Sequence, residues 1–231
     1  MYKNIELIHT LTHKESFVKA FDNFAYAKEM ISTPITIAEF YECCKDYPIL
    51  FVKDAEGNWS ASAMLGFKEK ENIFVDENGT WENLRYVPAS IRRYPFIFVN
   101  HEDNKLSLGL DSSAKSAGES KSDRKLFDEE GKPSEFLTGV MNFMNQFQAD
   151  AGTSGQFIKQ LDQWGLLEEK TAQIVTPDQT SYQINGFYVV NEEKLQHLSK
   201  KKKQEMCDHN AFQLITAHLI SLSNVQRMGM R

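Results

Sequence analysis

Residues 47–67 read Tyr47-Pro-Ile-Leu-Phe-Val-Lys-Asp-Ala-Glu-Gly-Asn-Trp-Ser-Ala-Ser-Ala-Met-Leu-Gly-Phe67, and this stretch decides the fold class. Two β-prone runs, 47–52 and 59–67, flank four residues, Asp54-Ala-Glu-Gly57, of the kinds that favour turns. The stretch therefore predicts a β-hairpin. A second hairpin is predicted around Asn78-Gly79, because this dipeptide is typical of a type I′ turn.

A further pair of apolar runs follows, at 94–99 and 106–110, and reads as another strand pair. Together these runs predict one meandering antiparallel sheet over residues 47–111, with its alternating apolar positions covering one face of a core. Helical spacing and capping residues predict the remaining elements. These are two short helices within 14–46 broken before Pro34, a helix over the apolar stripe 136–147, a helix that Thr153 or Ser154 caps and Gly165 ends, strands at 172–175 and 182–190, a helix from Asn191 to the lysines 200–203, and a closing helix at 211–225.

The predicted fold class is α+β, with a mostly antiparallel sheet packed against C-terminal helices. We expect residues 1–231 to form a single α+β domain. Two lobes are possible within it, a helix-plus-sheet lobe at 1–111 and a helix-rich lobe with a short strand pair at 126–231. The segment 112–125 has almost no apolar content, so we expect it to be a mobile loop.

Composition excludes several classes of protein. The 231 residues include 26 Lys and Arg against 32 Asp and Glu, for a formal net charge of −6, which argues against binding to duplex nucleic acid. No window approaches the length of a membrane span, and Glu6 and His9 interrupt any secretory signal. Cys43, Cys44 and Cys207 are an odd set of cysteines with an adjacent pair, which favours reduced thiols and a cytoplasmic location.

The sequence carries no specific catalytic motif. The acidic turn at 76–79 fails the calcium-loop spacing, and Gly152-Thr-Ser-Gly155 lacks the phosphate-loop pattern. A nucleophile elbow and zinc-type cysteine pairs are missing as well. We therefore predict no catalytic residue, metal or cofactor, although scattered histidines could still converge in the folded chain.

The most unusual segment is Tyr86-Val-Pro-Ala-Ser-Ile-Arg-Arg-Tyr-Pro-Phe96. Arg92 and Arg93 stand between two proline-stiffened aromatic stretches, and their planar guanidinium groups suit carboxylate or phosphate. Internal salt bridges to the protein's own acids are one interpretation, and an anionic ligand or peptide carboxylate is the other. We select Arg92, Arg93 and Tyr94 as candidate ligand-binding residues. If the segment is extended, the two arginines point to opposite faces.

The same segment carries a family resemblance. From about His13 to Met228 the chain resembles the SapC family, with the Arg-Arg-Tyr-Pro-Phe element as the most specific part. The matching stretches are 47–52, Ala63-Met-Leu-Gly-Phe67, 71–76, Trp81, 86–96, Leu126-Phe-Asp-Glu-Glu-Gly-Lys-Pro133, Ile184-Asn-Gly-Phe-Tyr-Val-Val190 and Ala217-His-Leu-Ile-Ser-Leu-Ser-Asn224. The segment from His101 to Asp111 departs from the family, which commonly has a more apolar strand ending near a cysteine there.

The resemblance implies a bacterial protein related to surface-layer biology, and it supplies no catalytic residues. We expect a soluble binding or accessory protein that recognises a peptide or protein partner connected with cell-surface products. The alternative is an enzyme, or an enzyme's partner, that modifies a peptide or small molecule alongside halogenase-like or cupin-like oxygenases. The lack of a catalytic motif favours the first hypothesis, and neither indicates an oligomeric state.

Overall fold

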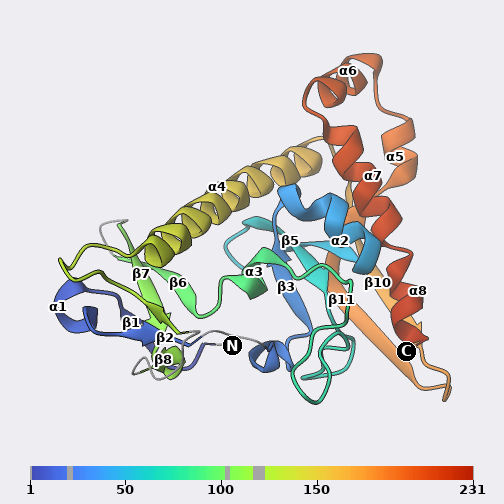
Figure 1. The fold of residues 1–231 in the computed structure, drawn as a ribbon. Coiled ribbons are helices and arrows are strands. Elements are labelled where there is room, and N and C mark those ends of the chain that lie inside the picture. The colour runs from blue at the N-terminus through green and yellow to red at the C-terminus, as the bar shows by residue number, and fades with distance from the viewer. Residues whose placement is uncertain (1, 20–22, 102–104, 117–122, 231) are drawn as a thin grey trace.

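The computed structural model describes residues 2–19, 23–101, 105–116 and 123–230. It is an α+β protein, as the sequence predicts, with antiparallel sheets and C-terminal helices (Figure 1). The strands are β1 (Ile5–Leu7), β2 (Phe17–Val18), β3 (Ser32–Ile35), β4 (Ile49–Lys53), β5 (Trp59–Met64), β6 (Phe96–Asn100), β7 (Leu106–Asp111), β8 (Lys115–Ser116), β9 (Arg124–Lys125), β10 (Leu167–Val175) and β11 (Ser181–Val190). The α-helices are α1 (Thr10–His13), α2 (Phe40–Asp46), α3 (Ala89–Arg92), α4 (Glu135–Gln163), α5 (Glu192–Gln196), α6 (Lys200–Asp208), α7 (Ala211–Ser221) and α8 (Asn224–Gly229), and the 3-10 helices are η1 (Ala25–Ala27), η2 (Ile37–Glu39) and η3 (Ser112–Ala114).

The largest sheet has the strand order β10-β11-β4-β5-β3, and all neighbouring strands are antiparallel. The predicted β4–β5 hairpin forms, and the later strand pair β10–β11 extends the same sheet. Helices α2 and α7 cover one face of this sheet (Figure 1). This face is apolar because Ile49, Phe51 and Ala61 alternate toward the helices with almost no exposure.

The prediction of a single meander over 47–111 is wrong, because β6 and β7 belong to a second sheet with the order β1-β7-β6. The chain leaves the main sheet after β5, and at the expected second hairpin Val75 and Trp81 form only an isolated bridge. The turn there is also not type I′, since only Gly79 has a positive φ. The Asp76 carboxylate closes it by accepting hydrogen bonds from the amides of residues 78 and 80.

Two helical predictions near the ends of the chain are also wrong. The helical spacing of Phe17, Phe21 and Phe24 predicts the first helix, but Phe17 and Val18 form β2 in a small third sheet of order β8-β2-β9. Lys200 begins α6 instead of ending the preceding helix, because the Ser199 hydroxyl accepts a hydrogen bond from the Lys202 amide and caps a new start. The α5 helix does begin after Asn191, as predicted.

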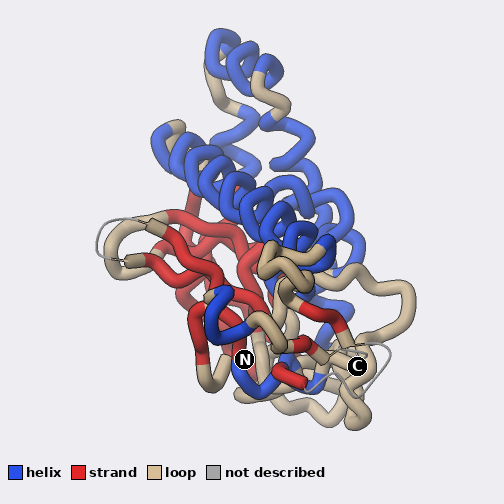
Figure 2. The backbone as a smooth tube through the Cα atoms, turned by 60° about the vertical axis from the view of Figure 1, so that its left-hand side comes forward, coloured by secondary structure: helices blue, strands red, loops and turns tan. Residues whose placement is uncertain are grey.

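A single 29-residue helix, α4, replaces the two helices predicted between 134 and 165. Thr153 and Ser154 lie inside it and donate their hydroxyls to backbone carbonyls four residues earlier, so neither is a cap. Its start is capped by Ser134, and Gly165 follows its end with φ of 73°. The helix crosses the molecule from the β6–β7 side to the α5–α7 side (Figures 1 and 2).

Two clusters of buried apolar residues share this helix. The larger cluster lies between the main sheet and its helices and includes Ile158 and Leu161 of α4. The smaller cluster lies against β2, β6 and β7 and includes Leu137 and Met144 of α4. The middle of α4 therefore passes the junction of the two clusters, and the Arg92–Arg93 segment also lies there.

The remaining expectations concern loops and membranes. The centre of the predicted mobile loop, residues 117–122, lies outside the described residues. The three cysteines carry free thiols. None of the helices in the described ranges is long and apolar enough to cross a membrane.

Candidate functional site

A cavity of about 330 Å³ opens at the junction of the two apolar clusters. Five elements contribute to its wall: the end of α3, the start of β6, β2 with the residue after it, β9 and the first half of α4. Its lining residues are Val18, Lys19, Arg92, Arg93, Tyr94, Pro95, Phe96, Arg124, Phe136, Val140 and Phe143. We call this cavity the basic pocket.

The charge of the pocket is entirely positive. The described residues that line it include four cationic side chains and no carboxylate. None of the four forms an ion pair with Asp or Glu within the described residues. The internal salt bridges considered for Arg92 and Arg93 are therefore not observed in the part of the chain that the structure describes.

Arg92 is held at the mouth of the pocket by neutral partners. Its Nη2 donates to the Tyr86 hydroxyl at 3.1 Å, and its Nε donates to the Val87 carbonyl at 2.9 Å. The guanidinium carbon also lies 5.5 Å from the centre of the Phe143 ring and 5.6 Å from that of Tyr86. These contacts orient the guanidinium without cancelling its charge.

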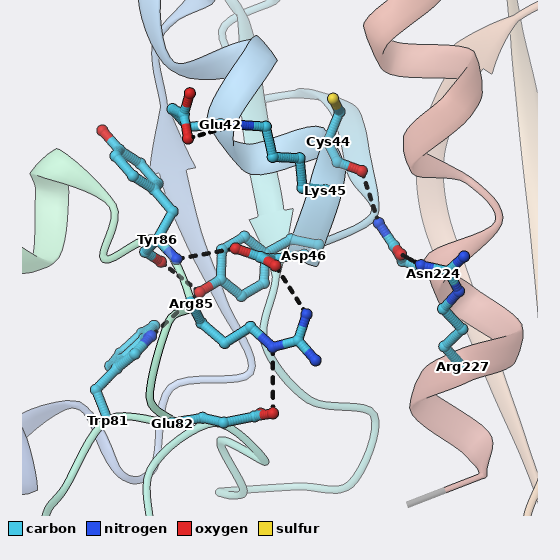
Figure 3. A network of polar contacts seen from close by, with 11 residues as sticks. Glu42, Cys44, Lys45, Asp46, Trp81, Glu82, Arg85, Tyr86, Asn224 and Arg227 are labelled. Atoms are coloured by element: carbon cyan, nitrogen blue, oxygen red, sulfur yellow. Dashed lines mark hydrogen bonds and ion pairs between the residues drawn. The ribbon is translucent and has the colours of Figure 1, made fainter.

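Tyr86 in turn donates hydrogen bonds to two carboxylates, which hold it in place. Its hydroxyl donates to Oε1 of the buried Glu39 at 3.1 Å, and its amide donates to Oδ2 of Asp46 at 2.9 Å. Figure 3 shows Asp46 between this amide and the guanidinium of Arg85, with which it forms a 2.9 Å ion pair. Burial, with the negative charge of Glu39 nearby, raises the pKa of Tyr86 to about 12, so the hydroxyl remains a donor at neutral pH.

Arg93 is the more enclosed of the two arginines. It is half-buried, its guanidinium carbon lies 5.1 Å from the centre of the Phe147 ring, and its buried Nε has no hydrogen-bond partner among the described residues. Tyr2 lies close by: burial raises its pKa to about 12, and the charge of Arg93 opposes that rise. A buried donor without a partner is costly unless a ligand or water satisfies it.

Tyr94 is one of the residues that line the pocket, and its side chain has contacts on other elements. The ring stacks on Tyr26 with 4.1 Å between centroids, and the hydroxyl lies 3.5 Å from Oδ2 of Asp111 and 3.3 Å from the Ser113 hydroxyl. The peptide bond to Pro95 is cis. Tyr94 therefore lines the site while its hydroxyl is directed to protein groups.

The expectation that Arg92 and Arg93 point to opposite faces of an extended segment is wrong. Residues Ala89–Arg92 form one helical turn, and Arg93 follows it directly, so both side chains reach the same pocket. Pro88 precedes the turn and supplies the carbonyl that accepts from the amides of Ile91 and Arg92. The helical turn, and not strand alternation, sets the direction of the pair.

Sequence reasoning missed the other half of the pocket. Lys19 and Arg124 come from the β2–β9 region, which was predicted as a helix and a loop, and nothing local marks them. Phe136, Val140 and Phe143 were assigned to a core stripe. The apolar stripe over 136–147 is wide for one helix face. Its width is the one local signal that some of its residues line a cavity in addition to packing in the core.

The scattered histidines do not converge on this site. His218 belongs to α7 and is fully buried. Its Nδ1 lies 2.9 Å from the Ile49 carbonyl, and its Nε2 accepts from the Val190 amide at 3.1 Å. Burial lowers its pKa to about 4. It is a neutral core residue whose polar atoms are both satisfied.

The fold and the site define an α+β protein with a basic, partly aromatic pocket at the junction of two apolar clusters. The SapC family model matches residues 8–228, nearly the whole chain, and the protein belongs to that family. Neither the curated proteins nor the solved structures include a significant match.

Proposed function

We propose that this SapC-family member is a binding protein whose basic pocket recognises a negatively charged group carried by a peptide or protein partner. The observation that carries the proposal is a set of four cations that line one cavity beside an apolar wall, with no ion-pair partner in the described ranges: Lys19, Arg92, Arg93 and Arg124. A pocket of about 330 Å³ with a few convergent polar groups has the size and composition of a ligand site.

The physical basis is the incomplete satisfaction of the arginines. The guanidinium carbons lie 5.5 Å and 5.1 Å from the ring centres of Phe143 and Phe147, and the hydrogen bonds of Arg92 to Val87 and Tyr86 use two of its five N–H donors. A hydrogen bond between charged partners contributes about 1.5–3 kcal/mol, more than one between neutral groups. An anion reaching Arg93 also offers an acceptor near the buried Nε that lacks one among the described residues.

The resemblance to the SapC family also bears on the kind of partner. Its implied link with surface-layer biology supports a partner that is a cell-surface peptide or protein. Carboxylate, histidine and cysteine are missing from the lining as far as the structure describes it, and the groups that are present support recognition by charge and apolar contact.

The test is affinity capture from the native bacterial lysate, with mass spectrometry of retained proteins and small molecules. Wild type is compared with Arg93→Gln and with Lys201→Gln, which removes one exposed positive charge on α6 away from the pocket. The proposal requires a retained species that is lost with Arg93→Gln and kept with Lys201→Gln. Identical retention by all three proteins would refute it, provided that the variants melt like the wild type.

A further inference from the structure

We propose that the pocket takes the C-terminal carboxylate of the partner, and that the preceding residues of the partner pair as a strand with the open edge of β6. This inference rests on the proposed function and specifies the ligand of the same pocket. Two independent observations support it: the mixture of cations and apolar groups within one small cavity, and the state of the β6 edge beside it.

The first observation concerns the composition of the cavity. Arg92 and Phe143 are in contact, and both line a space of about 330 Å³ together with Val140. At a peptide C-terminus, the carboxylate and the last side chain leave the same Cα atom, so a charge and an apolar group arrive side by side. An acidic side chain within a chain offers only one or two methylenes beside its carboxylate, and inorganic phosphate would leave the apolar wall exposed to water.

The second observation concerns β6, which lies at the edge of the β1-β7-β6 sheet and starts at the pocket with Phe96. In an antiparallel pair, alternate residues direct their N–H and C=O groups toward and away from the neighbouring strand. The Ile8 amide donates to the Leu108 carbonyl, so Leu108 faces β1 and Gly109 faces β6. Gly109 is opposite Ile97, and the backbone groups of Phe96 and Phe98 consequently point outward.

These two outward positions differ. The Tyr2 hydroxyl donates to the Phe96 carbonyl at 2.7 Å, whereas no group within the described residues bonds to the Phe98 N–H or C=O from that side. The strand reads Phe-Ile-Phe-Val-Asn and has none of the charges or prolines that commonly protect a free edge. Such an edge is suited to pairing with an added strand.

The direction and register of the partner follow from these positions. The pocket lies at the N-terminal end of β6, so a chain whose C-terminus enters it runs antiparallel to β6. Its last residue lies beside Phe96, and its third residue from the end lies opposite Phe98. That residue exchanges two backbone hydrogen bonds with Phe98, while the amide of the penultimate residue points away.

The experiment uses a synthetic library of N-acetylated pentapeptides with free C-termini, screened on the intact protein. The tightest binder is then labelled and its Kd measured by fluorescence anisotropy as the free acid and as the C-terminal amide. Two further versions carry an N-methyl group on the amide of either the third or the second residue from the end. Wild type, Arg93→Gln, Arg93→Lys and Lys201→Gln are compared, with melting curves as a check on folding.

The inference predicts at least tenfold weaker binding of the amide than of the acid. Methylation at the third residue weakens binding about tenfold, and methylation at the second leaves it within about twofold. Arg93→Gln loses most of the discrimination between acid and amide, Arg93→Lys retains part of it, and Lys201→Gln retains all of it.

Two outcomes would overturn this inference and leave the proposed function standing. One is a peptide that binds equally as acid and amide but is lost with Arg93→Gln, because another anionic group then occupies the pocket. The other is equal binding of the two methylated peptides, because the proposed strand pairing with β6 requires them to differ. Failure of every pentapeptide to bind, together with lysate capture that is indifferent to Arg93, would overturn both proposals.

Discussion

Acidification should destabilise this protein through one buried histidine on α7. His218 stacks on Phe51 with 4.5 Å between ring centroids, and its two nitrogens contact the Ile49 carbonyl of β4 and the Val190 amide of β11. These two strands share a single register pair, Tyr188 with Phe51. The imidazole therefore supplies cross-strand hydrogen bonds where the ladder between β4 and β11 is short.

The magnitude follows from the pKa. Burial lowers the pKa of His218 from 6.5 to about 4, so the unfolded state binds more protons than the folded state between these two values. Stability is therefore fully present above pH 6.5 and falls as the pH drops toward 4. The total loss is about 3 kcal/mol, at 1.36 kcal/mol per pKa unit, and about 2 kcal/mol of it falls between pH 7 and pH 5.

The assay is urea unfolding at pH 7 and pH 5 for the wild type and for His218→Gln, which does not titrate in this range. The substitution should itself cost about 2–4 kcal/mol at pH 7, because the Ile49 carbonyl and the Val190 amide lose well-placed partners. The decisive quantity is the difference between the two proteins in their change with pH. The other histidines, such as the buried His13, are the same in both proteins, so any contribution they make cancels in this difference.

An equal loss of stability in the two proteins from pH 7 to pH 5 would refute the reasoning. So would a wild type that loses less stability than His218→Gln over this range, because the sign of the difference between the two proteins depends on the lowered pKa of His218. The denaturant m-value must stay constant, since a change in it would report a change in compactness and not in stability.

Three further predictions concern other parts of the fold, and the last compares two glycine substitutions. Glu39→Gln should lower the free energy of unfolding by about 2–3 kcal/mol in urea titrations, because the buried carboxylate accepts four hydrogen bonds that one amide cannot all replace. An aromatic disulfide reagent should label the exposed Cys207 first and the fully buried Cys43 only on unfolding, since burial also raises the pKa of the Cys43 thiol. Gly229→Ala should cost about 1–3 kcal/mol by calorimetry, because a Cβ atom there would lie 2.8 Å from the Ile174 side chain. By contrast, Gly152→Ala, with no neighbour within 4 Å in the middle of α4, should stabilise the protein by about 0.5–1 kcal/mol.

Local signals predicted the parts of the fold that local forces decide. The β4–β5 hairpin depends on a turn sequence and two adjacent apolar runs, and both lie within residues 47–67. The assignment of strands to sheets depends on contacts across long stretches of chain, such as β1 with β7, and the sequence contains no local record of them. The middle of α4 shows the same limit, because Thr153 and Ser154 favour caps locally while packing against both apolar clusters keeps the helix continuous.

The candidate site likewise has one part that local sequence signals indicated and one part that they did not. Arg92 and Arg93 stood out because two guanidinium groups adjoin within an aromatic, proline-containing segment. Their common direction depends on a single helical turn after Pro88, too short to leave a periodic signal. Lys19 and Arg124 reach the pocket only because β2 pairs with β9, more than a hundred residues later in the chain.

The pocket is positive although the protein as a whole carries a formal charge of −6. The structure accounts for this, because the carboxylates nearest the segment already have partners. Glu39 accepts from Thr36, Tyr86 and the Ala89 amide, Asp46 is paired with Arg85, and Asp111 accepts from the Lys3 and Ser113 amides. Each of these carboxylates thus has its hydrogen bonds or ion pair from groups other than Lys19, Arg92, Arg93 and Arg124. The attraction for an anion is therefore local and set within a negatively charged molecule, so added salt should weaken binding at the pocket mouth, near the exposed Arg92, more than at the half-buried Arg93.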